Sequence, residues 1–381
     1  MKKKGKRCLW KVLFLLGCFF LVPFIREAGL GAGPEKKAVF KPALPGWNFQ
    51  FPRDHRVHRD FKTEWWYYNG HLQDGQGEKY GYQLTFFRVG LVPGTLPGPG
   101  SRWRIKEMIM AHLALTDIRA GTFRFLEKAG RGNLGLAGAE ENRYRVWLEN
   151  WSVEEEGAGH VLLAGDRDFG FRLRVLPVKA PAIHGRGGVS RKGEGAGRAS
   201  HYYSLTRLQT EGVLFLKGKE VPVTGSSWMD HEFGSDQLQD HQIGWDWFSL
   251  QLDNNLDLMI YQIRNRDGSL DPYSSGSLIF PDAATQHLTR TDFHLRVLDY
   301  WKSSRSGAVY PASWEIEVPG HQLRVRLTPL VADQELMTLK STRVTYWEGA
   351  VSVQGQFRGR PIRGRGYVEM TGYDRRFAPK I

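Results

Sequence analysis

Short runs in which large apolar side chains alternate with small or polar ones recur along the chain. The clearest are residues 169–175 and 80–88, and both carry aromatic residues. Successive side chains of a β-strand point to opposite faces, so a period of two is typical of a strand with one buried face. Long stretches with the period of an amphipathic helix are missing, and residues 333–340 are the best candidate for a short helix. The sequence therefore predicts an all-β protein.

An internal repeat indicates how these strands are grouped. Residues 211–230 resemble residues 348–369, so that Gly225–Asp230 falls on Gly364–Glu369. The aromatic hairpin at Trp65 likewise resembles the hairpin at Trp245. A duplicated unit of roughly eight to ten short strands suits a small antiparallel barrel with room for one ligand. We expect two such barrels in tandem, packed through an apolar interface with the Trp245 hairpin at its centre.

The sequence predicts four parts over the 381 residues. They are a signal peptide or N-terminal anchor at 1–33, a linker at 34–50, an N-terminal barrel domain at 51–235 and a C-terminal barrel domain at 236–381.

The first 33 residues have the composition of an export signal. Five basic residues lie within positions 2–7, an apolar run extends from Leu9 to Ile25, and small residues follow. This pattern is typical of a cleaved secretory signal, with an uncleaved N-terminal anchor as the second interpretation. A lipoprotein processing site at Cys18 ranks third, because the apolar run continues past it. We expect the protein in the periplasm or cell envelope.

Cysteine content and charge exclude some functions of the exported body. Both cysteines, Cys8 and Cys18, lie in the N-terminal segment, so the body has no disulfide, thiol nucleophile or cysteine metal site. The formal charge of +13 falls to about +7 once residues 1–33 are left out. The remaining positive charge is spread out, which allows contact with an anionic membrane surface but does not predict nucleic-acid binding.

One stretch holds acid, base and aromatic side chains at strand spacing. His201 and Tyr203 lie two residues apart, as do Trp228 and Asp230. If both strands belong to one barrel wall, all four side chains can face one cavity and form an acid/base site. The alternative is that the rings are ordinary core residues. The preceding segment, 177–199, is rich in glycine and basic residues, and we interpret it as a mobile loop that could cover the cavity.

Longer motifs resemble a known family. The chain is similar to the AttH-like branch of the carotenoid 1,2-hydratase superfamily, loosely called secreted hydrolases, over about residues 50–375. The motifs are Phe51-Pro52-Arg53-Asp54-His55, Thr63-Glu64-Trp65-Trp66-Tyr67, Gly81-Tyr82-Gln83-Leu84-Thr85-Phe86-Phe87-Arg88 and Trp228-Met229-Asp230-His231-Glu232-Phe233-Gly234. The resemblance implies two lipocalin-like barrels, an apolar ligand and no organic cofactor.

The resemblance also implies a catalytic group. In the hydratase branch it consists of a His, an aromatic residue two positions later and an aromatic-x-Asp downstream, which His201, Tyr203, Trp228 and Asp230 match. The ring types differ from that branch, and the continuation through His231 resembles the AttH branch instead. The substrate is therefore left open.

Hydration of an isolated double bond needs an acid, shielding of a cation and a water molecule. A carboxylic acid kept neutral by an apolar barrel can supply the proton, so we predict that burial raises the pKa of Asp230. Ring faces can stabilise the cation, and His201 could orient water. For the ligand-binding walls we predict Trp65, Trp66, Tyr82, Trp245 and Trp247.

Three other functions compete with this one. An envelope lipid carrier would need no catalysis and would use Asp230 and His201 as a buried structural pair. A hydrolase could use Ser226 or Ser227 with His231, although no nucleophile-elbow motif is present. A metal site is not predicted, because the sequence offers no recognisable ligand spacing. The expected partner is an apolar small molecule, an isoprenoid or lipid, bound by a monomer.

Overall fold

The computed structural model describes residues 39–93, 104–236, 238–375 and residue 377. The predicted signal or anchor at 1–33 lies outside these residues. Among the described residues, no helix is long and apolar enough to cross a membrane. No α-helix occurs in them either; the two helices, η1 (Arg53–His55) and η2 (Pro319–His321), are short 3₁₀ turns.

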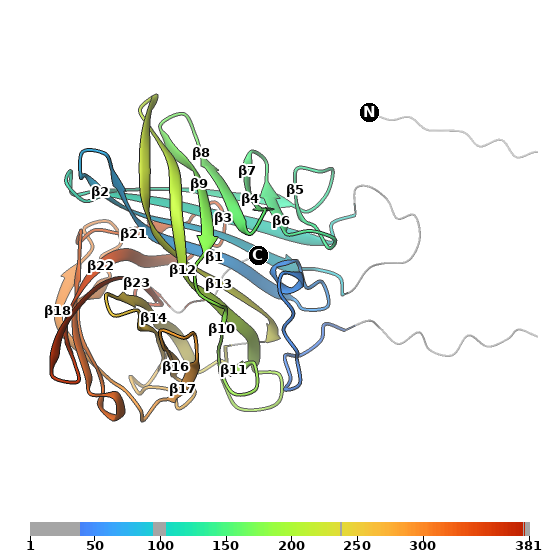
Figure 1. The fold of residues 1–381 in the computed structure, drawn as a ribbon. Coiled ribbons are helices and arrows are strands. Elements are labelled where there is room, and N and C mark those ends of the chain that lie inside the picture. The colour runs from blue at the N-terminus through green and yellow to red at the C-terminus, as the bar shows by residue number, and fades with distance from the viewer. Residues whose placement is uncertain (1–38, 94–103, 237, 376, 378–381) are drawn as a thin grey trace, which may run out of the picture. The chain divides into compact units, whose positions relative to one another are not determined.

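The first half of the chain forms one antiparallel sheet (Figure 1). Its strands are β1 (Thr63–Asp74), β2 (Lys79–Gly90), β3 (Glu107–Asp117), β4 (Thr122–Arg131), β5 (Ala137–Ala139), β6 (Arg145–Leu148), β7 (Trp151–Glu156), β8 (Gly159–Gly165), β9 (Phe169–Pro177), β10 (Ala182–Ile183), β11 (Val189–Arg191), β12 (Ala199–Leu216) and β13 (Lys219–Asp236). They run in the order β4-β3-β2-β1-β13-β12-β9-β8-β7-β6-β5, and β10 and β11 pair with β12. Because β4 packs against β5 and β6, the sheet curves back on itself.

The second half forms another antiparallel sheet. Its strands are β14 (Gln242–Leu252), β15 (Asp257–Asn265), β16 (Ser275–Ile279), β17 (Thr285–Thr289), β18 (His294–Lys302), β19 (Val309–Val318), β20 (Leu323–Pro329), β21 (Glu335–Met337), β22 (Thr345–Phe357) and β23 (Arg360–Thr371). They run in the order β17-β16-β15-β14-β23-β22-β20-β19-β18, and β21 pairs with β22. The prediction of a short helix at 333–340 is wrong, because β21 lies there and pairs with β22.

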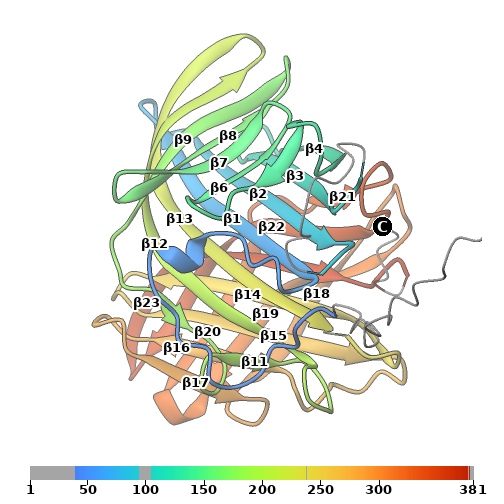
Figure 2. The same ribbon diagram turned by 90° about the vertical axis from the view of Figure 1, so that its right-hand side faces the viewer.

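In both sheets the last long strand returns to the first. β13 pairs with β1, and β23 pairs with β14 (Figure 2). Asp230 on β13 and Glu369 on β23 therefore occupy equivalent places, as the sequence repeat predicted. The prediction of an all-β fold with two antiparallel barrel-like units is confirmed.

Each sheet buries its own apolar core, and a third cluster joins the two. This shared cluster contains Tyr67 and Trp228 from the first sheet and Trp247 and Tyr367 from the second, with Trp245 packed against it. The expectation of an apolar interface around the Trp245 hairpin is therefore confirmed. Residues 38–381 form one compact unit, and the division into domains at residue 235 stays a prediction.

Candidate active site between the two sheets

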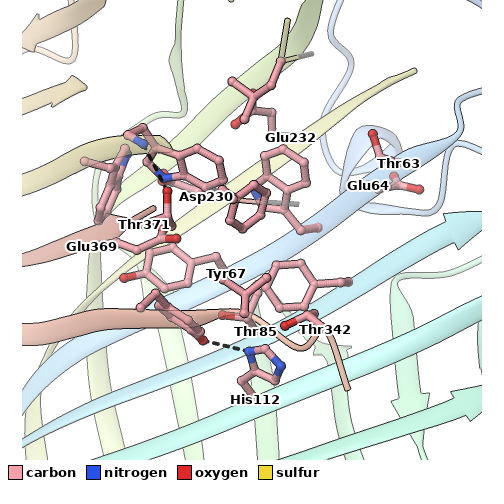
Figure 3. A pocket seen from close by; sticks show the side chains of 18 of the residues that line it. Thr63, Glu64, Tyr67, Thr85, His112, Asp230, Glu232, Thr342, Glu369 and Thr371 are labelled. Atoms are coloured by element: carbon pink, nitrogen blue, oxygen red, sulfur yellow. Dashed lines mark hydrogen bonds between the residues drawn. The ribbon is translucent and has the colours of Figure 1, made fainter. Parts of the chain in front are cut away.

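A cavity of about 450 Å³ lies between the two sheets (Figure 3). Its walls come from β1, β2, β3, β12 and β13 of the first sheet and from β14, β15, β22 and β23 of the second. The aromatic and aliphatic lining is formed by Trp65, Tyr67, Phe87, Val89, Met110, Tyr202, Leu238, Trp245, Trp247, Tyr261, Ile263, Val344, Tyr346 and Phe377. Such a chamber excludes water from an apolar ligand and strengthens every electrostatic interaction inside it.

Asp230 is one of three acids of the first sheet that line this cavity, together with Glu64 and Glu232. Its side chain is buried, and three donors converge on it: Tyr202 Oη at 2.7 Å, Trp228 Nε1 at 2.6 Å and Ser204 Oγ. Burial raises the pKa of Asp230 to about 7, although the hydrogen bonds from these donors act to lower it. The predicted direction is therefore confirmed. A carboxyl group with a pKa near neutrality can give and take a proton at neutral pH.

A buried histidine stands behind Asp230. His184 Nε2 lies 2.6 Å from Ser204 Oγ, and His184 Nδ1 lies 2.9 Å from Ser277 Oγ on β16. Burial lowers the pKa of His184 to about 3, so the ring is neutral. A neutral ring that donates from Nε2 leaves the Ser204 hydroxyl free to donate to Asp230. His184 therefore fixes the orientation of one of the donors to the acid.

Two further carboxyl groups line the cavity from the second sheet. Glu348 on β22 and Glu369 on β23 are directly paired across neighbouring strands. Burial raises the pKa of Glu369 to about 8, and the negative charges of Asp230 and Glu232 add to this effect. Burial, followed by the charge of Glu369, also raises the pKa of Glu348 well above its ordinary value. Both groups therefore favour the neutral acid at pH 7.

The basic side chains of the cavity wall are engaged with other acids. Lys192 Nζ lies 3.3 Å from Glu232 Oε1 and 3.8 Å from the centre of the Tyr261 ring. Arg88 Nε donates to Glu107 at 2.6 Å. The cavity consequently presents aromatic faces and acid groups rather than free basic ones.

Three of the five predicted ligand-binding residues line the cavity, namely Trp65, Trp245 and Trp247. Trp66 and Tyr82 do not. Both are fully buried in the core of the first sheet, where Trp66 Nε1 donates to the His55 carbonyl and Tyr82 Oη donates to Ser227. The strand alternation that brings Trp65 to the cavity turns Trp66 away from it.

The expectation that His201 and Tyr203 share a cavity with Asp230 is wrong. Residues paired across antiparallel strands lie on the same face, and Asp230 is paired with Ser204 whereas Tyr203 is paired with His231. Tyr202 and Ser204 therefore face the cavity. The spacing of two residues was correct within each strand, but the register between β12 and β13 decides which set faces the acid.

His201 and Tyr203 lie on the opposite face of β12. The His201 ring packs against Trp47 and Phe233, and Tyr203 Oη contacts His55 Nδ1 at 2.6 Å and His231 Nδ1 at 3.0 Å. The buried Asp230–His201 pair that the carrier hypothesis required is consequently not formed.

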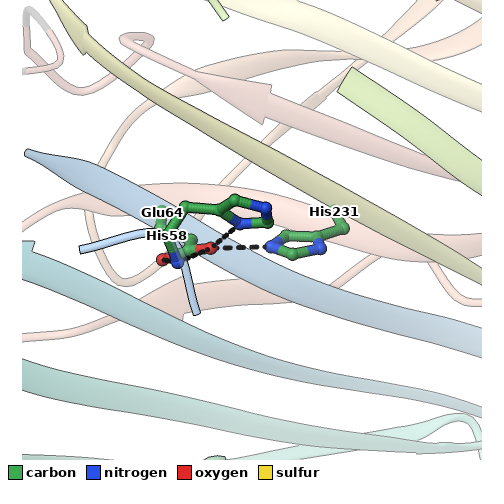
Figure 4. Close-up of side chains that lie close together, drawn as sticks. All are labelled: His58, Glu64 and His231. Carbon is green, nitrogen blue, oxygen red and sulfur yellow. Dashed lines mark hydrogen bonds and ion pairs between the residues drawn. The ribbon is translucent and has the colours of Figure 1, made fainter. Parts of the chain in front are cut away.

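A second buried polar group lies on that opposite face (Figure 4). Glu64 Oε1 accepts from His58 Nδ1 at 2.8 Å and from His231 Nε2 at 2.9 Å, and both carboxylate oxygens accept from the His58 backbone N–H. Burial alone would raise the pKa of Glu64, but the hydrogen bonds from His231 and His58 outweigh it and hold the pKa well below its usual range.

The three donor atoms of this group, from His58, Glu64 and His231, lie close enough together to hold a metal ion. Their lone pairs are already used. Glu64 accepts from both rings, His231 Nδ1 contacts Tyr203, and Arg88 Nη1 lies 3.6 Å from Glu64. A cation bound here would have to displace these hydrogen bonds beside a guanidinium, so the group fits a structural network better than a metal site.

The serine pair considered for a hydrolase is not assembled with a base. Ser226 Oγ donates to Gln251, and Ser227 Oγ contacts Tyr82 and Thr210. Within the described residues, neither hydroxyl has a hydrogen bond to His231. The arrangement gives no activated serine nucleophile.

Segment 177–199, expected to be a mobile loop, is tied to the first sheet. Its strands β10 and β11 pair with β12, and the segment carries both His184 and Lys192 to the site. The expectation of a free loop is therefore wrong, although the segment does border the cavity.

Several residues of this site were not predicted from the sequence: Tyr202, Ser204, His184, Lys192 and Glu348. Tyr202 and Ser204 could have been found only by knowing the strand register. Glu348 could not have been found from the repeat, which aligns it with Glu211, because its place beside Glu369 depends on the register of β22 and β23.

Two antiparallel barrel-like sheets that enclose an aromatic, acid-lined cavity define a protein with lipocalin-like architecture. A family model described as AttH-like matches residues 42–373, and the chain belongs to this family. The crystal structure of an AttH protein from Nitrosomonas europaea is 34% identical, with a TM-score of 0.79, and the alignment covers 87% of this chain and 99% of that one.

More distant relatives share the fold or part of the sequence. Kievitone hydratase from Nectria haematococca has a TM-score of 0.67 at 15% identity, with 88% of this chain and 98% of that chain covered. Dehydratase asqC from Emericella nidulans is 21% identical over 208 residues, which are 53% of this chain and 58% of that protein. The chain thus spans little more than half the length of this relative.

Proposed function

We propose that the protein is a hydratase-like enzyme that adds water to a carbon–carbon double bond of an apolar small molecule held between the two sheets. The observation that carries the proposal is Asp230, a buried carboxyl group at the wall of an aromatic cavity with a pKa near neutrality. The names of two relatives, a hydratase and a dehydratase, support it, because hydration and dehydration are one reaction run in opposite directions.

In the proposed reaction Asp230 transfers its proton to one alkene carbon. The neighbouring carbon becomes positively charged, and the faces of Trp65, Trp247 and Tyr202 stabilise it through their ring quadrupoles. The oxygen of a water molecule then adds to this carbon, and the surplus proton returns to the Asp230 carboxylate. The net change is the addition of one water, with the acid regenerated.

The donors around Asp230 have a definite part in this cycle. Tyr202, Ser204 and Trp228 donate to the carboxylate that is left after proton transfer and stabilise it inside an apolar site. Trp247 Nε1 donates to Tyr202 Oη at 3.1 Å, which turns the Tyr202 hydroxyl proton toward Asp230. Without these donors, the conjugate base would be too unstable for proton transfer at neutral pH.

Native mass spectrometry of the protein purified from its own host tests the proposal. We expect a co-purified unsaturated small molecule that gains the mass of one water on incubation with the parent protein but not with an Asp230→Asn variant. A ligand that binds both proteins equally and never changes mass would support an envelope lipid carrier instead. Export and membrane-surface contact are separate proposals, and fractionation of the host cells tests them.

A further inference from the structure

The Glu348–Glu369 pair has no part in the hydration proposed above. The two glutamates face each other on neighbouring strands, and both line the cavity. Glu348 is 2% exposed. In the first sheet, the residue at the position equivalent to Glu348 is Ser204, which donates to Asp230. The second sheet thus has a second carboxyl group where the first sheet has a hydroxyl donor.

The pair is poorly satisfied by its surroundings. Among the described residues, no basic side chain forms an ion pair with Glu348 or Glu369. Glu348 Oε1 and Tyr67 Oη are both buried and form no hydrogen bond of normal geometry within the described chain. Contacts from Tyr67 to Glu348 and from Trp245 to Glu369 lower the pKa values of the two carboxyl groups without offsetting burial. A buried carboxyl pair at a cavity wall with only neutral partners points to a ligand that supplies the missing positive charge.

We propose that the Glu348–Glu369 pair forms one end of the cavity and that this end binds an organic cation, namely an ammonium group attached to an apolar chain. The carboxyl groups supply the compensating charge. Trp65, Tyr67 and Trp245 supply ring faces of the kind that hold ammonium groups elsewhere in proteins. The apolar chain of such a ligand fits the rest of the lining. This inference goes beyond the hydratase function and does not depend on it.

The charges around the pair should make the affinity for the cation depend on pH. Asp230 and Glu232 on β13 add negative potential at Glu369. His112 on the β3 wall is neutral, because burial lowers its pKa to about 3. A bound cation favours the ionised glutamates and lowers their raised pKa values, so binding must release protons. Affinity should therefore increase with pH up to about 8, the pKa of Glu369 in the free protein.

Titration calorimetry with octyltrimethylammonium tests this directly. A quaternary ammonium has no proton of its own, so any pH dependence belongs to the protein. Octan-1-ol serves as the neutral probe with the same chain. We expect the cation to bind about tenfold more tightly than the alcohol at pH 8, to lose this advantage by pH 6, and to release protons into the buffer. Equal affinities, or no binding of the cation by the parent protein, would overturn the proposal.

Variants then assign the effect to the pair. Glu348→Gln and Glu369→Gln should each lose most of the preference for the cation while retaining octanol binding, which shows that the cavity is intact. Glu141→Gln, at an exposed surface glutamate, is the matched control and should behave as the parent. Full cation binding by both pair variants would refute the assignment. Asp230→Asn should abolish hydration and only weaken cation binding, because it removes one neighbouring negative charge but leaves the glutamate pair in place. Loss of hydration with retained preference for the cation over octanol therefore distinguishes failure of one proposal from failure of the other.

Discussion

Glu64 and Asp230 are both buried carboxyl groups of the first sheet, yet their surroundings act on them in opposite directions. Glu64 lies between two imidazoles and a guanidinium, which hold its pKa well below the usual range. Asp230 receives only neutral donors, and burial raises its pKa to about 7. Glu64 thus has positive charge beside it, from His58, whose pKa burial would lower but hydrogen bonds to acids raise, and from Arg88, whereas neutral donors alone leave Asp230 poised for proton transfer.

The comparison separates a structural carboxylate from a functional one. The Glu64 network joins His58, which lies between η1 and β1, to β1 and β13, and it satisfies the groups it contains. Glu64 also lines the cavity, but among the described residues Asp230, Glu348 and Glu369 have no positively charged partner, and burial raises their pKa values. An acid whose pKa is raised at a cavity is a candidate for function, while an acid held ionised by hydrogen bonds and nearby positive charge is a candidate for stability. The following predictions test this distinction.

The largest effect is expected from Glu64→Gln. Removal of the charge takes one buried counter-charge from His58 and from Arg88, which keep Asp54 and Glu107 as partners, and breaking such a network costs about 3–5 kcal/mol. Urea unfolding at pH 7 measures the loss. Because the pKa of Glu64 is lowered by folding, its contribution is present above about pH 4.3 and is lost as pH falls further. The difference between variant and parent should therefore shrink on acidification.

Glu141→Gln provides the control for this measurement. Glu141 pairs with Arg59 at an exposed site, and such pairs contribute about 1 kcal/mol or less. A Glu64→Gln protein that loses no more stability than Glu141→Gln would remove the distinction between the two carboxyl groups.

Asp230→Asn should have the opposite pH dependence. A carboxyl group whose pKa is raised by folding costs the folded state stability as pH rises from about 3.9 to the folded value of about 7. Asparagine has no charge to bury, so the variant should gain roughly 2 kcal/mol relative to the parent between pH 5 and pH 7.5. Denaturant melts at both values measure this gain. A constant or growing deficit of the variant at pH 7.5 would show that Asp230 is a stabilised carboxylate like Glu64.

The sequence predicted the strands and the chain's repeat, but not which residues meet at the site. The period of two in runs such as 169–175 reports local geometry, so β9 and the all-β fold followed from it directly. The equivalence of Asp230 and Glu369 also followed, because duplicated strands occupy equivalent places.

Pairings between distant segments carry no such local signal. The register that opposes Ser204 to Asp230 depends on how β12 and β13 meet, and a shift of one residue exchanges the two faces. His184 reaches Ser204 only because β10 folds back onto β12. These contacts belong to the tertiary structure, and the spacing of residues cannot supply them.

Ser204→Ala should change the titration of Asp230 with a smaller effect on stability. The variant loses a donor that favours the carboxylate, so the pKa of Asp230 should rise by about one further unit. The infrared band of the protonated acid, assigned by its loss in Asp230→Asn, follows this titration. His184→Asn should shift the band in the same direction if the ring orients the serine hydroxyl. An unchanged midpoint in both variants would mean that the Ser204–His184 contact is only packing.

The smallest effects on stability are expected from phenylalanine substitutions of the neighbours Tyr202 and Tyr203. These variants also test which face of β12 is turned toward Asp230. Each loses one buried hydroxyl on substitution by phenylalanine, and each variant should be destabilised by about 1 kcal/mol. Only Tyr202→Phe removes a donor to Asp230, so it alone should raise the midpoint of the infrared titration. Tyr203→Phe disturbs the contacts with His55 and His231 on the other face and should leave the Asp230 midpoint unchanged. A shift in Tyr203→Phe without one in Tyr202→Phe would reverse the assignment of the faces and return Tyr203 to the role that the family resemblance implied.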